Sequence, residues 1–195
     1  LATLDDEIQI TFSVNVSPRQ FTNQSFIDKV KNIIDLTGIN PGKLKLEITE
    51  SMIIENIDQT INTMNRLIEL GIRFSIDDFG TGYSSLAYLN RLPFDELKID
   101  QSFVRNITTT PENAVIVETI INMAKNLKLG IIAEGVETIE EINFLKAKQC
   151  SQFQGFYFAK PDNFEALLSL NEYHPNKVKN IKNIDTHLFK NSKPA

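Results

Sequence analysis

Residues 74–85 read Phe-Ser-Ile-Asp-Asp-Phe-Gly-Thr-Gly-Tyr-Ser-Ser and combine a strand-like run with a loop that contains two glycines. An apolar run ends in two adjacent carboxylates, Asp77 and Asp78, and a loop with two glycines follows. Like charges at this range repel each other, so the pair costs free energy unless a cation lies nearby. Side chains alternate along a strand and would point to opposite faces, unless the chain turns here, which Gly80 and Gly82 allow. The stretch therefore indicates either a surface turn or the edge of a cation site.

The rest of the chain alternates between strand-like and helix-like segments. We expect strands at residues 9–15, 43–48, 72–77, 96–100, 129–134 and 152–154. Helices are expected at residues 25–36, 58–70, 84–90, 112–127, 139–148 and 164–170. The helix over residues 112–127 is expected to bury Val115, Ile116, Ile120 and Met123. No hairpin signal joins the strands, so the pattern predicts an α/β fold of parallel strands with helical crossovers.

Two architectures fit this alternation, the open doubly wound sheet and the (β/α)8 barrel. In both, function lies at the C-terminal ends of the strands. The first strand is not followed by a GxGxxG motif, and no GxxxxGK[ST] motif occurs in the sequence. The absence of both motifs argues against an open sheet that binds a nucleotide cofactor.

Composition narrows the function further. The chain has 195 residues, 42% of them hydrophobic, which is enough for one domain with a sizeable core. A net charge of −5 argues against non-specific binding to long nucleic acid. The single cysteine, Cys150, gives no disulfide framework, fits a reducing compartment and is expected to be a semi-buried side chain. No apolar run approaches the length of a membrane span. The chain starts without Met and close to a strand, which suggests a piece of a longer protein.

Polar groups end all six expected strands. They are Asn15, Glu47, Asp77 with Asp78, Lys98, Glu134 and Gln154. Any one of them could be an ordinary turn residue, because loops favour Asp and Asn. In a barrel, however, the four carboxylates would converge in one pocket and repel one another without cations. Oxygen ligands without His or Cys select hard cations such as Mg²⁺ or Mn²⁺. The chemistry this favours is metal-assisted hydrolysis of a phosphodiester, with Lys98 offering positive charge to a phosphate or lowering the pKa of a bound water.

Six motifs make the chain similar to the EAL-domain family, the bacterial cyclic di-GMP phosphodiesterases. They are NVSPRQ at 15–20, LEITES at 46–51, IDDFGTGYSSL at 76–86, LKID at 97–100, AEGVET at 133–138 and QGFYFAKP at 154–161. The resemblance implies a TIM-like (β/α) barrel that hydrolyses cyclic di-GMP to linear pGpG. Two alternatives stay open: a non-catalytic signalling module that binds cyclic di-GMP, and an unrelated barrel enzyme that uses Mg²⁺ on another phosphorylated substrate.

The resemblance also implies a set of metal ligands. Asn15, Glu47 and Asp77 match the ligands of one ion, either Mg²⁺ or Mn²⁺. Asp77, Asp78 and Glu134 match the ligands of a second ion, so that Asp77 bridges the two.

Further residues match the family's catalytic positions. Lys98 and Gln154 match residues that orient the attacking water. Glu134 is counted with them, and Glu50 matches a residue that holds the loop after Asp78. In the family, that loop links metal binding and substrate to dimerisation.

The chain departs from the family at its start. No strand carrying Glu-Ala-Leu precedes Asn15, and the literal Glu-Ala-Leu at 165–167 follows the last expected strand, where it is expected to be ordinary helix. We therefore expect a partial domain at 1–172 with about six of eight βα units, and a polar tail at 173–195. Alone, such a chain is expected to be weakly active or inactive.

An open barrel exposes two strand edges, so a homodimer is expected. The resemblance implies a cytoplasmic domain, even in a membrane-anchored parent protein, with a sensor or GGDEF domain as an upstream neighbour.

Overall fold

The computed structural model describes residues 11–50, 52, 57–82 and 89–162. Its strands are β1 (Phe12–Asn15), β2 (Leu44–Thr49), β3 (Arg73–Phe79), β4 (Glu96–Ile99), β5 (Gly130–Glu134) and β6 (Gln152–Gln154). Its helices are α1 (Pro18–Phe21), α2 (Phe26–Thr37), α4 (Ile57–Glu69), α6 (Gln101–Val104), α7 (Pro111–Asn126) and α8 (Ile139–Ala147), with a 3₁₀ turn, η1, at Pro41–Lys43. The six expected strands are confirmed, while the helix expected at 164–170 and most of that at 84–90 lie outside the described residues.

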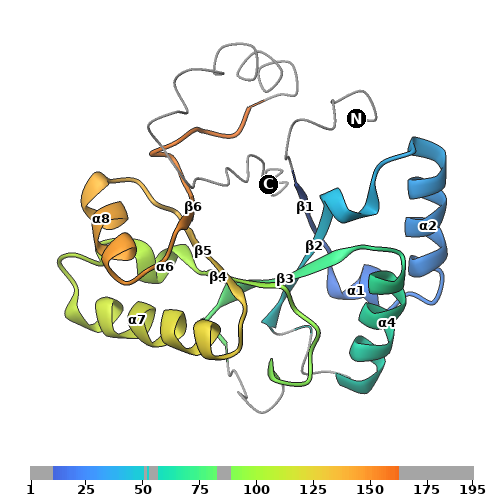
Figure 1. Ribbon diagram of the computed structural model, residues 1–195, viewed down its shortest axis with the longest axis horizontal. Coiled ribbons are helices and arrows are strands. Elements are labelled where there is room, and N and C mark those ends of the chain that lie inside the picture. Colours follow the sequence, from blue (N-terminus) through green and yellow to red (C-terminus); the bar gives the residue numbers. More distant parts are fainter. Residues whose placement is uncertain (1–10, 51, 53–56, 83–88, 163–195) are drawn as a thin grey trace.

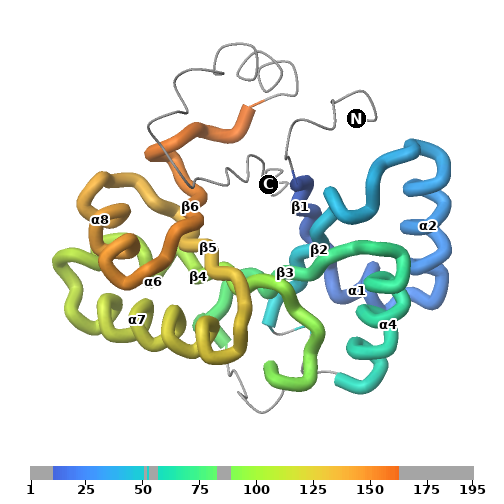
Figure 2. Tube along the Cα trace, in the orientation of Figure 1, coloured from blue at the N-terminus to red at the C-terminus, as the bar shows by residue number. Residues whose placement is uncertain are grey.

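The strand order identifies the architecture. The six strands form one sheet in the order β1-β2-β3-β4-β5-β6, and each neighbouring pair is parallel. A doubly wound sheet reverses its order at a switch point, whereas a barrel keeps sequence neighbours side by side. The sheet curls into a half barrel with the helices on its outer side (Figure 1; Figure 2). The TIM-like alternative is therefore the correct one.

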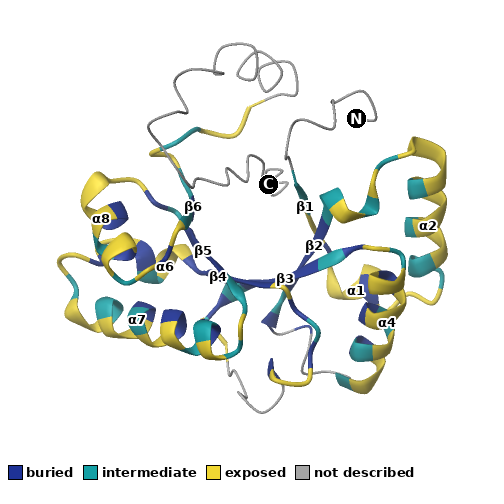
Figure 3. Ribbon diagram, in the orientation of Figure 1, coloured by how far each residue is buried: buried dark blue, intermediate teal, exposed yellow. Residues whose placement is uncertain are grey.

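Alternation along the strands separates an apolar outer face from a polar inner face. Leu46, Ile76, Leu97 and Phe153 belong to the hydrophobic core, and each is at most 3% exposed. Buried positions follow the strands and the sheet-facing sides of the helices, while exposed positions lie outermost (Figure 3). The residues between the outer-face positions point the other way, so the polar side chains of the strands collect on the inner face.

A buried ion pair lies on this inner face. Lys45 Nζ on β2 lies 2.7 Å from Glu96 Oε1 on β4, and the two side chains are only 4% and 8% exposed. Ser75 on β3 lies between them, with its Oγ 3.4 Å from Glu96 Oε1. The pair spans three neighbouring strands, so it fixes β2 and β4 relative to β3.

Replacing Lys45 by methionine is expected to destabilise the fold by about 3–5 kcal/mol, because it removes the cation that neutralises a buried carboxylate. For a chain of this size the melting temperature should fall by about 10 °C. Arg91→Met, which breaks the exposed Arg91–Asp58 pair, is the control, with an expected change of at most about 1 kcal/mol. Calorimetric melting measures both variants, and equal losses in the two would contradict the prediction.

The helices of the structure differ from the predicted ones in the buried face of α7 and in two additional short helices. Val115 is 64% exposed and Ile116 is 37% exposed, so the prediction that α7 buries them is wrong, although Ile120 is buried as expected. The apolar face is turned toward Val117 and Ile121, which are fully buried. The short helices α1 and α6 were not predicted.

Two further predictions concern the burial of Cys150 and the lack of a membrane-spanning segment. Cys150 is 1% exposed, and burial raises the pKa of its thiol to about 11, so it is an inert core residue at neutral pH. Among the described residues, no helix combines the length and the apolar character that crossing a bilayer requires.

Candidate metal centre

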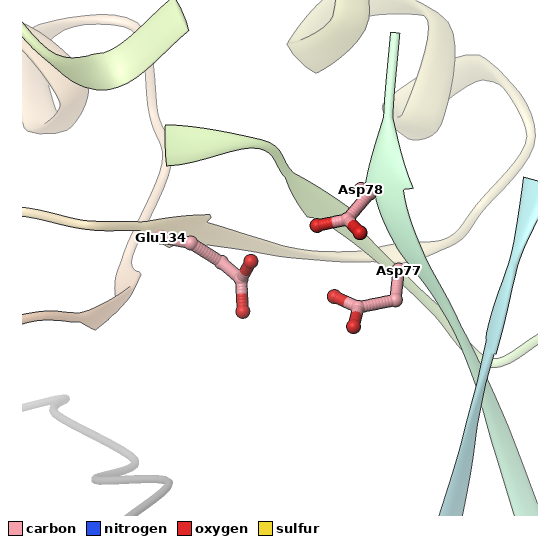
Figure 4. A group of neighbouring side chains, drawn as sticks. All are labelled: Asp77, Asp78 and Glu134. Carbon is pink, nitrogen blue, oxygen red and sulfur yellow. The ribbon is translucent and has the colours of Figure 1, made fainter. Parts of the chain in front are cut away.

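The ends of β3 and β5 bring three carboxylates together. One ligand oxygen from each of Asp77, Asp78 and Glu134 lies within 4.8 Å of the others. Figure 4 shows the two aspartates reaching from β3 toward the glutamate on β5. Asp77 and Glu134 are buried and Asp78 is half-buried, so the cluster is largely withdrawn from water.

A bulge at the end of β3 allows both aspartates to face this cluster. The register between β3 and β4 shifts between Ile76 and Phe79, and Asp78 has a φ of 53°. This left-handed conformation is uncommon for residues other than glycine, although aspartate tolerates it better than most. The backbone therefore leaves the regular strand conformation already at Asp78, two residues before Gly80, and this cancels the normal alternation of side chains.

Lys98 ties the carboxylates of three strands to β4. Its Nζ lies 2.7 Å from Glu47 Oε2, 2.9 Å from Asp77 Oδ1 and 2.7 Å from Glu134 Oε1. The lysine side chain is fully buried, and those of its three partners are at most 5% exposed. Burial by itself lowers the pKa of Lys98, but attraction to the three carboxylates outweighs it and raises the pKa above its usual range. Lys98 is therefore a cation at neutral pH.

The strand register places two further predicted residues at either side of the cluster. Asn15, at the end of β1, is paired with Glu47, and its side chain is exposed. Gln154, at the end of β6, is paired with Glu134 and is half-buried. Each of the six strands thus brings its predicted polar group to the same end of the sheet.

Glu50 lies just beyond β2 and contacts the loop that follows β3. It is 6% exposed, and neither carboxylate oxygen has a hydrogen-bond partner among the described residues. A Cβ placed on Gly82 would lie 3.0 Å from the Glu50 carboxyl carbon and from its Oε1. The absence of a side chain at Gly82 therefore lets the loop approach Glu50, and the role of Glu50 in holding this loop stays a prediction.

The Lys45–Glu96 ion pair, which lies next to the cluster on the inner face, was not predicted from the sequence. Lys45 precedes Glu47 by two residues, and Glu96 precedes Lys98 by two residues. The period of a strand places each of them on the same face as the residue above it. The two-residue spacing could have indicated that Lys45 and Glu96 lie on the inner face. That they form an ion pair with each other depends on β2 and β4 both neighbouring β3, and the sequence left the strand order open.

The donor set of the cluster fits a hard divalent cation. Its ligand atoms are carboxylate oxygens, and within the described part of the chain neither His nor Cys joins the group. Mg²⁺, Mn²⁺ and Ca²⁺ prefer such oxygen ligands. The fold and the site together define a (β/α)-barrel protein with an acidic cluster at the C-terminal ends of its strands.

Comparison with known proteins identifies the family. The chain matches the EAL domain over residues 1–161. It is 43% identical over 159 residues to the cyclic di-GMP phosphodiesterase NbdA of Pseudomonas aeruginosa, an alignment that covers 82% of this chain and 20% of that protein. The chain thus spans about a fifth of the length of this curated relative. The chain belongs to the EAL domain family.

Solved structures agree with the sequence match. The structure described as the PaMucR phosphodiesterase in complex with c-di-GMP superposes with a TM-score of 0.78 at 40% identity, over 80% of this chain and 64% of that one. BlrP1 of Klebsiella pneumoniae, in a complex with manganese and cyclic di-GMP, superposes with a TM-score of 0.71 at 30% identity. That match covers 77% of this chain and 38% of BlrP1. BlrP1, to which this chain is similar, therefore binds manganese together with cyclic di-GMP.

Proposed function

We propose that this chain hydrolyses cyclic di-GMP to linear pGpG at a site that uses two Mg²⁺ or Mn²⁺ ions. The observation that carries the proposal is the convergence of Asp77, Asp78 and Glu134 within 4.8 Å at one end of the sheet. The proposal is supported by NbdA, a cyclic di-GMP phosphodiesterase, and by the manganese and cyclic di-GMP complex of BlrP1.

The residues divide into two overlapping ligand sets. Asn15, Glu47 and Asp77 would hold one ion, while Asp77, Asp78 and Glu134 would hold the other. When bound there, divalent ions supply positive charge that stabilises the phosphoryl oxygens of a phosphodiester. The shared Asp77 carboxylate would keep the two ligand sets next to each other.

Lys98 and Gln154 would position the reacting water. Because Lys98 is a cation, it donates hydrogen bonds and does not act as a base. Its ammonium would hold the water oxygen or a phosphate oxygen, and the carboxylates are the groups able to accept the water's proton. Water attacks phosphorus, the bond from phosphorus to the ribose 3′ oxygen breaks, and that oxygen takes up a proton, so one phosphate stays on a 5′ carbon as pGpG requires.

Product analysis tests the proposal. The chain is incubated with cyclic di-GMP in Mn²⁺, in Mg²⁺ and in EDTA, and the nucleotides are separated by chromatography. We expect pGpG to form slowly with either ion, as the weak activity expected of a partial domain requires, and none to form in EDTA. Binding detected by calorimetry without pGpG would favour the signalling-module alternative, while neither binding nor hydrolysis would overturn the proposal. The homodimer and the sensor or GGDEF neighbour stay predictions, and sedimentation would test the former.

A further inference from the structure

Lys98 contacts the same carboxylates that would bind a divalent ion. Its three partners come from β2, β3 and β5, and every contact is between 2.7 and 2.9 Å. Glu47 belongs to one proposed ligand set, Glu134 to the other, and Asp77 to both. Asp78 adds a fourth carboxylate within reach of Asp77 and Glu134.

The four carboxylates of this cluster repel one another unless a positive charge lies among them. Four carboxylates gather at one end of the sheet, and the three that contact Lys98 are almost completely buried. Buried like charges at this range disfavour the folded chain, unless they are paired or take up protons. Lys98 supplies the positive charge from within the chain, at the centre of the group.

We infer that Lys98 is the chain's own counter-ion for the acidic cluster, and that a divalent ion competes with its ammonium for the same carboxylate oxygens. This inference concerns the site of the proposed function and rests on that site binding a divalent ion. It has two consequences. The chain folds without a divalent ion because Lys98 is present, and ion affinity is lower than the carboxylates alone would give, because the ion meets a positive charge already in contact with them.

Thermal unfolding of Lys98→Met with and without ions tests the inference. Wild type, Lys98→Met and the charge-retaining Lys98→Arg are melted in EDTA and in saturating Mn²⁺, at matched ionic strength. We expect Lys98→Met to melt well below wild type in EDTA and to recover most of the difference in Mn²⁺. A ligand that binds only the folded state raises its stability. Lys98→Arg is expected to respond to Mn²⁺ as wild type does.

Lys45→Met is the matched control. It removes a buried lysine from an ion pair on the same inner face, with a contact of the same 2.7 Å length, but that pair lies outside the acidic cluster. It is expected to lose the same amount of stability in EDTA and in Mn²⁺. Calorimetric titration with Mn²⁺ gives a second readout, in which the dissociation constant of Lys98→Met should be about tenfold lower than that of wild type.

Each outcome bears on the inference. Equal losses of Lys98→Met in EDTA and Mn²⁺, or no loss in EDTA, would overturn it, whereas a variant that folds only with Mn²⁺ would support it. If Lys98→Met is unfolded in both conditions, Lys98→Gln is measured instead, and the same failure there counts against the inference. Failure of the proposed function shows separately, as absent hydrolysis by wild type, because melting and titration require no substrate.

Discussion

Asp77→Asn is expected to abolish hydrolysis of cyclic di-GMP, with a loss of at least about a hundredfold in turnover, since even outer-shell partners of a metal cost 10–100-fold. Asp77 is the only residue assigned to both proposed ligand sets, so the substitution weakens the binding of both ions at once. An amide has the shape of a carboxylate but lacks its charge, and it offers one oxygen instead of two. Chromatography of pGpG in saturating Mn²⁺ measures the effect.

The fold should survive this substitution. Asp77 is one of several carboxylates around Lys98, and removing one negative charge lowers the repulsion among the others. Asp58→Asn is the matched control, because Asp58 is an exposed aspartate of α4 whose ion pair with Arg91 lies on the surface. It is expected to keep wild-type turnover. Wild-type turnover by Asp77→Asn, in a chain that melts normally, would remove the basis for the two-ion assignment.

Much of the fold could be predicted because each strand carries its own local signal. A short strand-like segment with a polar group near its end recurs six times, and the structure has a strand at each place. The choice between barrel and doubly wound sheet could not be made from these signals, since strand order is set by how the crossovers pack and not by any one segment. Only the sequential order of the sheet settles it.

The candidate site was predictable in membership but not in geometry. The positions of the carboxylates at the predicted strand ends indicated which of them would gather, and the resemblance to the family implied a role for each. That Asp77 and Asp78 face one side depends on a bulge and a left-handed residue, which adjacent aspartates do not themselves specify. The exposed Val115 and Ile116 show the limit of periodicity, because α7 carries apolar residues on more than one face and only packing selects among them.

Gly155 is the position where a single methyl group is expected to do the most damage to the fold. A Cβ placed there would clash with the O and N atoms of Val136, which are backbone atoms that cannot move aside alone. The same segments are joined by hydrogen bonds from Val136 N to Gln154 O, 3.1 Å, and from Tyr157 N to Val136 O, 3.1 Å. The exits of β5 and β6, which are the segments that directly follow these strands, therefore pack backbone against backbone.

Gly155→Ala must separate these two exits, and overpacking of this kind costs about 3 kcal/mol. For a chain of this size that predicts a fall of about 10 °C in the melting temperature. Glu134 and Gln154 immediately precede the separated segments, so turnover should fall as well, even at temperatures where the variant is folded.

Gly130→Ala provides the matched control within the same sheet. A Cβ there would lie 3.4 Å from Asp95 O, an ordinary contact, so the same methyl addition should change the melting temperature little. Calorimetry and the pGpG assay are applied to both variants. If Gly155→Ala melted like Gly130→Ala, the exits of β5 and β6 could not be packed as closely as described. The position of Gln154 beside Glu134 would then lose its structural support.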